Sequence, residues 1–277
     1  MEFSAVFFGL VSAVTWGAGD FSGGMAVKRT NPYGVVIAAH AFSLILFVTL
    51  GIVTGEPVPP LHDWMWGGAA GIGGGIGLAL LYSALASGQM STAAPVSALV
   101  AAALPVLVGA FSEKLPGWGV LIGFGLALTA VWLISGGIGL EFQPEKLRLP
   151  LLAGVGFGAF FIFIHQGSSQ SILWPLVATR IASISSLLIF STVTRQPWIP
   201  TRDSWFPILM SSLLDSAGNA FYALSARMGR MDVAAVLGSL YPGSTVLLAW
   251  IILKERVSPL QMTGILLALV AIVLITI

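Results

Sequence analysis

The stretch Asp203–Ala226 reads DSWFPILMSSLLDSAGNAFYALSA, which is long enough to cross a bilayer, yet it carries the acid Asp215 at its middle. An ionised carboxylate at bilayer depth is costly unless it is paired or hydrated, so such a residue is expected to face a cavity or a partner. Asn219 and Tyr222 follow at helical spacing and share this face. One face of the predicted helix is therefore polar.

The composition is that of an integral membrane protein. Of the 277 residues, 57% are hydrophobic and only 8% are charged, whereas a soluble domain has about 25% charged residues. The formal net charge of +1 indicates neither a nucleic acid nor an acidic partner. The absence of cysteine excludes disulfides, thiolate metal sites and cysteine nucleophiles. No P-loop, metal-ligand pair or nucleophile constellation is present in the sequence, so we predict no cofactor.

Apolar segments of about 20 residues, the length that about 30 Å of hydrocarbon requires, recur along the whole chain. The first has no basic n-region and no clean cleavage site, so we expect a retained helix and not a signal peptide. The fold class that we expect is all-α, with ten transmembrane helices. They span residues 4–26, 32–54, 64–87, 92–112, 117–138, 149–168, 173–194, 203–226, 232–253 and 257–277.

An internal repeat organises these helices. When the sequence is shifted by 141 residues, Gly77–Ile134 lies on Gly218–Ile275 without a gap, and Trp64 meets Trp205. The first two helices of each half align more loosely, with Trp16-Gly17 over Phe157-Gly158. The sequence therefore predicts two five-helix repeats, residues 1–140 and 141–277.

Five helices per repeat is an odd number, so the second repeat must lie upside down relative to the first. Inverted repeats of this kind are typical of secondary transporters, whose substrate site lies near the middle of the membrane between the halves. The duplication within one chain also supplies the two-fold relation, so a monomer is expected to suffice.

Several short motifs carry a family resemblance. They are Trp16-Gly17 with Asp20, the sequence GQMSTAAP at 88–95, Leu-Tyr-Pro at 240–242 and KERVSPLQ at 254–261. Together they resemble the drug/metabolite transporter superfamily, in its EamA-type branch of five plus five helices, over essentially the full chain. The resemblance implies transport and favours efflux, but that superfamily handles amino acids, sugars, nucleotide derivatives, amines and drugs. In one departure, Glu113 lies one residue out of register with Glu255, so we interpret both as loop anchors.

Asp215 is the strongest candidate for a functional residue, because no membrane interface lies within reach of its side chain. The structural alternative is an ion pair with Arg180 of the seventh predicted helix. Arg180 lies about 10 Å deep and Asp215 about 16 Å deep from the same face, a difference that an arginine can bridge. Such a pair could still open for an anionic or zwitterionic substrate, with Arg180 holding a carboxylate.

Three further residues could carry protons or cations. Asp20 lies about 7 Å from the middle of the first helix, among glycines that allow close helix approach. The alternative is an acid near the mouth that pairs with Lys28 or extends to the membrane interface. His40 and His165 could titrate near neutral pH and relay protons, or be hydrogen-bonded packing residues. Coupling through Asp20, Asp215, His40 or His165 stays open at this point.

Four aromatic residues could wall a pocket for a flat or cationic substrate. They are Trp16, Tyr82, Tyr222 and Tyr241, and packing is the alternative for each. Pro95, Pro105 and Pro242 are candidate pivots, because proline breaks helical hydrogen bonds; tolerated kinks are the alternative. The run Gly71–Gly77 is Gly-rich like a phosphate loop, but within an apolar span it indicates close helix packing.

Charge placement predicts the orientation in the membrane. Most Lys and Arg residues lie in odd-numbered loops, which places those loops in the cytoplasm and both termini outside. The residues in odd loops are Lys28, Arg29, Lys146, Arg148, Arg195, Arg202, Lys254 and Arg256, against Lys114, Arg227 and Arg230 in even loops. We expect an integral protein of a prokaryotic plasma (inner) membrane.

The sequence thus predicts a secondary active transporter, an exporter of a small polar or amphipathic metabolite such as an amino acid or amine. It would work by alternating access, with proton coupling. An uncoupled exchanger or facilitator is the first alternative. An intramembrane lipid-modifying enzyme is the second; no motif supports it, and it would need an acid and a histidine together near an interface.

Overall fold

The computed structural model describes residues 3–87, 90–112, 115–134, 144–253 and 258–276. In these ranges all regular structure is helical, which confirms the predicted all-α class. The helices are α1 (Phe3–Val27), α2 (Pro32–Val53), α3 (Leu61–Ala86), α4 (Met90–Ser112), α5 (Trp118–Ile134), α6 (Pro144–Gly167), α7 (Leu173–Val193), the short 3-10 helix η2 (Arg202–Ser204), α8 (Trp205–Met228), α9 (Met231–Gly238), α10 (Tyr241–Leu253) and α11 (Pro259–Thr276). The predicted loop anchors Glu113 and Glu255 lie outside the described residues.

Six segments are long and apolar enough to cross a membrane by length and composition. They are α1, α2, α3, Leu147–Gly167 of α6, α7, and Met231–Ile252, which joins α9 to α10. Apolar stretches of α4, α5 and α11 are shorter. The protein is therefore an integral membrane protein.

Helix α8, with Asp215 at its middle, is not among these six segments of the described chain. Its hydropathy is lowered by Asp215 itself and by neighbouring polar residues. Three of them, Ser212, Ser216 and Asn219, are at most 4% exposed. Because these groups face protein and not lipid, a helix with this sequence can lie at membrane depth.

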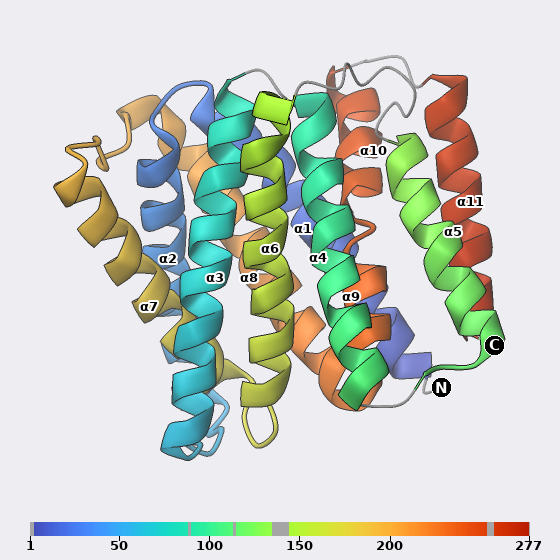
Figure 1. The fold of residues 1–277 in the computed structure, drawn as a ribbon. Coiled ribbons are helices and arrows are strands. Elements are labelled where there is room, and N and C mark those ends of the chain that lie inside the picture. The colour runs from blue at the N-terminus through green and yellow to red at the C-terminus, as the bar shows by residue number, and fades with distance from the viewer. Residues whose placement is uncertain (1–2, 88–89, 113–114, 135–143, 254–257, 277) are drawn as a thin grey trace.

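The helices lie side by side, and successive membrane-length helices run in opposite directions, with α9 and α10 following one another in the same direction (Figure 1). Both chain ends lie at the same end of the bundle (Figure 1). Helix α1 begins at that end, whereas α6 begins at the opposite end (Figure 1). The main packing partners recur in the two halves: α1 packs on α8 and α3 on α6, while α2 packs on α7 and α5 on α11. The helices of each half therefore interleave with those of the other.

Glycines on α3 allow its close approach to α7. A Cβ atom added to Gly71 would collide with the backbone of Thr179, and one added to Gly75 would collide with Ser183. Thr179 Oγ1 also donates a hydrogen bond of 2.9 Å to Gly67 O across the same contact. The close helix packing predicted for this Gly-rich run is confirmed.

The predicted span at 232–253 is present as one apolar segment, Met231–Ile252, but it is divided into two helices, α9 and α10. They are divided by a turn at Ser239 and Leu240. Pro242 explains the break, since it has no N–H to donate to Gly238 O and its ring crowds that carbonyl. The chain is thus interrupted where α10 begins with Tyr241.

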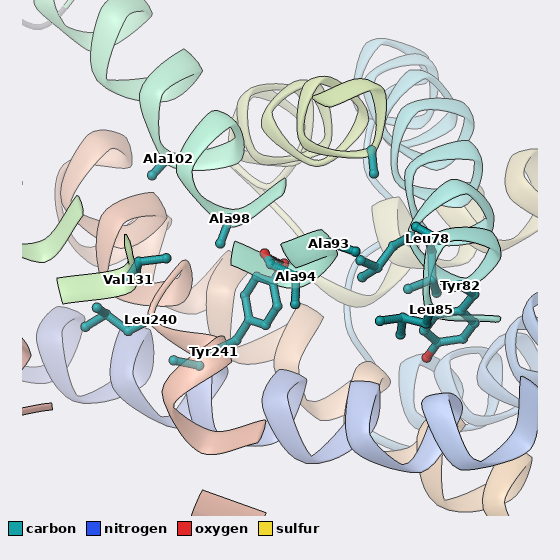
Figure 2. Close-up of a cluster of buried hydrophobic side chains, with 14 of the residues drawn as sticks. Leu78, Tyr82, Leu85, Ala93, Ala94, Ala98, Ala102, Val131, Leu240 and Tyr241 are labelled. Carbon is teal, nitrogen blue, oxygen red and sulfur yellow. Dashed lines mark hydrogen bonds between the residues drawn. The ribbon is translucent and has the colours of Figure 1, made fainter. Parts of the chain in front are cut away.

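The break turns the Tyr241 side chain toward the small residues of α4 (Figure 2). Tyr241 Oη donates a 2.9 Å hydrogen bond to Ala94 O and lies 2.9 Å from Ser97 Oγ. Alanines at 94 and 98 leave room for the ring, which is 4% exposed. The start of α10 is therefore anchored to α4.

Candidate functional site

A cavity between the helices contains about 540 Å³ of space free of atoms, including the part that is open to solvent. Helices from both halves line this cavity, and its polar residues gather from α1, α2, α7 and α8. Of the residues that the sequence analysis singled out, the structure brings seven to the cavity: Trp16, Asp20, His40, Arg180, Asp215, Asn219 and Tyr241.

An ion pair forms the centre of the polar part of the lining. Arg180 Nη2 donates to Asp215 Oδ2 at 2.6 Å, so the pairing considered from the sequence is present. The guanidinium also donates from Nε to Ser43 Oγ at 2.8 Å and lies 5.5 Å from the ring centre of Phe47. The Arg180 side chain is only 3% exposed, whereas that of Asp215 is 19% exposed. The pair therefore presents its carboxylate to the cavity.

His40 is held between α7 and the ion pair. Its Nε2 lies 3.0 Å from Arg180 Nη1 and its Nδ1 lies 2.7 Å from Ser183 Oγ. Arginine can only donate hydrogen bonds, so Nε2 must be the accepting, unprotonated nitrogen. Nδ1 then carries the proton and donates it to Ser183. This geometry assigns a neutral His40 for as long as Arg180 stays in place.

Hydrogen bonds along α8 hold Asp215 and the helix in position. Asn219 Nδ2 donates to Asp215 Oδ2 at 2.9 Å, and Ser216 Oγ donates to Ser43 Oγ at 2.6 Å. Ser212 Oγ donates to Ala39 O of α2 at 2.6 Å. These bonds connect α8 to α2 at the level of the ion pair, so the carboxylate of Asp215 is positioned by two helices.

Asp20 brings a second carboxylate to the cavity from α1. Its side chain is partly buried, and within the described residues no Lys, Arg or His forms an ion pair with it. The expected alternative, pairing with Lys28, is not found. The described lining thus holds two acids and a single guanidinium, since His40 is neutral. One carboxylate of the site lacks a compensating cation.

Part of the cavity lining is apolar, and the sequence analysis missed most of it. Phe157, Phe160 and Phe161 of α6 line it together with Gly74 and Leu78 of α3. Within this part the Trp16 ring stacks on Phe161 at 5.5 Å between centroids. The result is a wall of aromatic rings in the same cavity as the carboxylates.

The 141-residue repeat carried a signal for these positions. Adding 141 to Trp16 and Asp20 gives Phe157 and Phe161, and subtracting 141 from Asp215 and Asn219 gives Gly74 and Leu78. All eight positions line the cavity. A candidate residue in one half therefore pointed to its counterpart in the other half.

Three candidates do not line the cavity. Tyr82 is 1% exposed, with Oη 3.1 Å from Ser211 Oγ, and Tyr222 is fully buried behind Phe161, donating to Phe161 O at 3.0 Å. His165 lies near the carboxyl end of α6 and outside the lining. Within the described ranges, no three His, Asp or Glu side chains come together as a metal site would require.

A sequence model described as the EamA-like transporter family matches residues 3–136 and again residues 148–277. The chain belongs to the EamA-like transporter family. The resemblance to the drug/metabolite transporter superfamily is thereby confirmed, and this EamA-like protein is a membrane transporter of that type. The family is one of transporters and not of enzymes.

Solved structures agree with the fold. One, described only as the crystal structure of a protein, superposes with a TM-score of 0.76 at 17% sequence identity. The match covers 100% of this chain and 97% of that chain. At this identity the likeness concerns the fold alone. A search of curated proteins finds no significant match.

Proposed function

We propose that this EamA-like protein is a secondary active transporter that exports a small polar or amphipathic metabolite, such as an amino acid or amine. The observation that carries the proposal is a cavity lined by both halves of the chain, with both charged groups and aromatic rings in its lining. Such a surface suits a solute that has a charged group and an apolar body.

The proposed transport cycle is alternating access of two inverted five-helix halves, residues 1–140 and 141–277, within ten membrane crossings. The opposite starting ends of α1 and α6 support the inversion (Figure 1). The recurring pairs α1–α8 and α3–α6 also support it, because an inverted repeat places equivalent helices in equivalent contacts. A cavity on the boundary of the halves can then open to either side.

Proton coupling is proposed to act through Asp20. The charged and titratable groups around it come from several helices: Asp215, Arg180 and His40 with Tyr82 and Tyr241. Arg180 compensates Asp215, so only Asp20 is left for a proton or a cation to neutralise. His40 is a poor relay in this state because Arg180 occupies its accepting nitrogen.

Proteoliposome flux with a mixed metabolite panel tests this function, with and without an imposed pH gradient. Wild-type flux should follow the gradient, and Asp20→Asn should abolish that dependence because the proton site is lost. Asp203→Asn, an exposed acid outside the cavity, is the matched control and should behave as wild type. Flux that ignores the gradient in all three proteins would instead establish the uncoupled exchanger.

The lipid-modifying enzyme is disfavoured by the site itself. His40 Nε2 does lie 4.0 Å from Asp215 Oδ2, so an acid and a histidine are close together. However, the nitrogen that would accept a proton from a substrate is already bonded to Arg180. A general base needs that lone pair free.

The proposed orientation places both termini outside a prokaryotic plasma (inner) membrane. The cysteine-free chain allows a direct test with Val58→Cys in the α2–α3 loop and Gln196→Cys in the α7–α8 loop, both exposed. An impermeant thiol reagent should label position 58 on intact cells and position 196 only after permeabilisation. The reverse pattern would invert the orientation.

A further inference from the structure

The two ends of the central ion pair differ in their access to the cavity. Three donors of Arg180 are engaged, by Ser43, His40 and Asp215, and the guanidinium packs near the Phe47 ring. The side chain is 3% exposed. Arg180 lines the cavity, but it offers little surface there to a substrate carboxylate. Asp215 itself is 19% exposed and is the accessible member of the pair.

The hydrogen bonds of Asp215 leave one of its oxygens available. Arg180 and Asn219 both donate to Oδ2, and among the described residues no hydrogen bond to Oδ1 is found. A carboxylate oxygen has two lone pairs and can accept further donors. Asp20 adds a second acceptor group that has no cation partner in the described chain. The described part of the site thus offers a ligand two carboxyl groups with acceptor capacity and a single guanidinium.

The aromatic rings of the cavity also favour a cationic ligand. The ring centroids of Trp16 and Phe160 lie 6.4 Å apart. Phe157 lines the same cavity. Aromatic faces carry negative electrostatic potential, so they attract a cation and also bury an apolar body. The wall favours a positively charged, apolar ligand over a carboxylate-bearing one.

From these contacts we infer that the cavity binds a monovalent organic cation, a primary amine on an apolar body, in preference to an amino acid or an organic anion. The inference rests on the proposed transport function and narrows its substrate class. The ammonium donates to Asp20 and to Asp215 Oδ1, while the apolar body lies against Trp16 and Phe157. One cation neutralises the one uncompensated carboxylate.

Three probes with the same phenyl body and different charges test the inference. They are phenethylamine (a cation), phenylalanine (a zwitterion) and 3-phenylpropionate (an anion), titrated at pH 7 into the purified full chain by calorimetry. We expect phenethylamine to bind tighter than phenylalanine by about tenfold or more, since a charge-assisted contact is gained and no second carboxylate is buried. Tighter binding of phenylalanine or 3-phenylpropionate, or no binding of any probe, would overturn the inference.

Variants locate the cation. Asp20→Asn should weaken phenethylamine by about tenfold or more and leave 3-phenylpropionate unchanged or tighter. Asp203→Asn, outside the cavity, should change neither affinity. If the Asp20→Asn protein misfolds, the titrations of the three probes into the wild-type protein still test the inference, because they need no variant.

Counterflow of the same probes in proteoliposomes separates the two proposals. Exchange of phenylalanine without exchange of phenethylamine would keep the transport function and reject the cation. Tight, Asp20-dependent binding of phenethylamine with no exchange of any probe would keep the cation site and reject transport. Exchange of phenethylamine that competes with unlabelled amine and not with 3-phenylpropionate is the expected result.

Discussion

The α1–α8 and α3–α6 helix pairs line one cavity with opposite chemistry. At positions related by 141 residues, the first pair carries Asp20 and Asp215 where the second carries Phe161 and Gly74. The backbone arrangement recurs, whereas the side chains have diverged. Two similar helix pairs thus form an amphipathic cavity, in which one pair supplies the carboxylates and the other supplies apolar residues.

The two helix pairs, α1–α8 and α3–α6, are also held together by different contacts. Between α1 and α8, serine hydroxyls donate to carbonyls of the facing helix: Ser12 to Gly218 O at 2.9 Å and Ser225 to Ala5 O at 2.6 Å. Between α3 and α6, glycines bring the backbones together, so that a Cβ on Gly156 would collide with Gly73 O. Polar side chains hold the first pair, and close backbone packing holds the second.

The largest expected effect comes from removing Arg180, the cation that pairs with Asp215 of the α1–α8 helix pair. Arg180→Met leaves Asp215 without its ion partner and should lower the free energy of unfolding by about 3–5 kcal/mol. Arg180→Met combined with Asp215→Asn should recover most of this loss, because no unpaired charge remains. Denaturant unfolding in detergent measures both. A single variant as stable as wild type would mean that Asp215 is not held by Arg180.

A smaller effect is expected from disturbing the α3–α6 helix pair. Gly156→Ala should cost about 1–3 kcal/mol of unfolding free energy, because its methyl group meets the α3 backbone. Gly68→Ala, on α3 with no heavy atom within 4 Å of an added Cβ, is the control and should be neutral or stabilising. Equal stabilities of the two variants would show that close backbone contact does not hold this pair.

The smallest effect concerns the serine bonds of the polar pair. Ser12→Ala should cost about 0.6 kcal/mol, the average worth of a hydrogen bond between membrane helices. Ser22→Ala, also buried on α1, removes only a bond to Ala18 O of its own helix and should cost less. The comparison is made by thermal unfolding of both variants. A larger loss in Ser22→Ala would contradict the role given to the interhelical bonds.

Several features of the cavity could not be predicted from the sequence. Periodicity shows which residues share a helix face, but not which other face they meet. Tyr82, Tyr222 and Tyr241 were equal candidates from the sequence, but only Tyr241 of the three lines the cavity. Phe160 was not a candidate, and it does line the cavity. Pro242 was a candidate pivot, but hydropathy does not distinguish a proline that bends a helix from one that separates two helices, as between α9 and α10.

The sequence by itself determined the all-helical membrane class and the close packing of the α3 glycines, and it made Asp215 a candidate residue. These follow from the length and hydrophobicity of each span, from its glycine content, and from the cost of a charge in hydrocarbon. The family was indicated by the resemblance of its short motifs. The tertiary structure alone decided which candidates meet in one cavity, which atom of the Arg180–Asp215 pair is accessible, and that His40 is neutral. Those properties depend on contacts between helices far apart in the chain, as with Arg180 and Ser43, 137 residues apart.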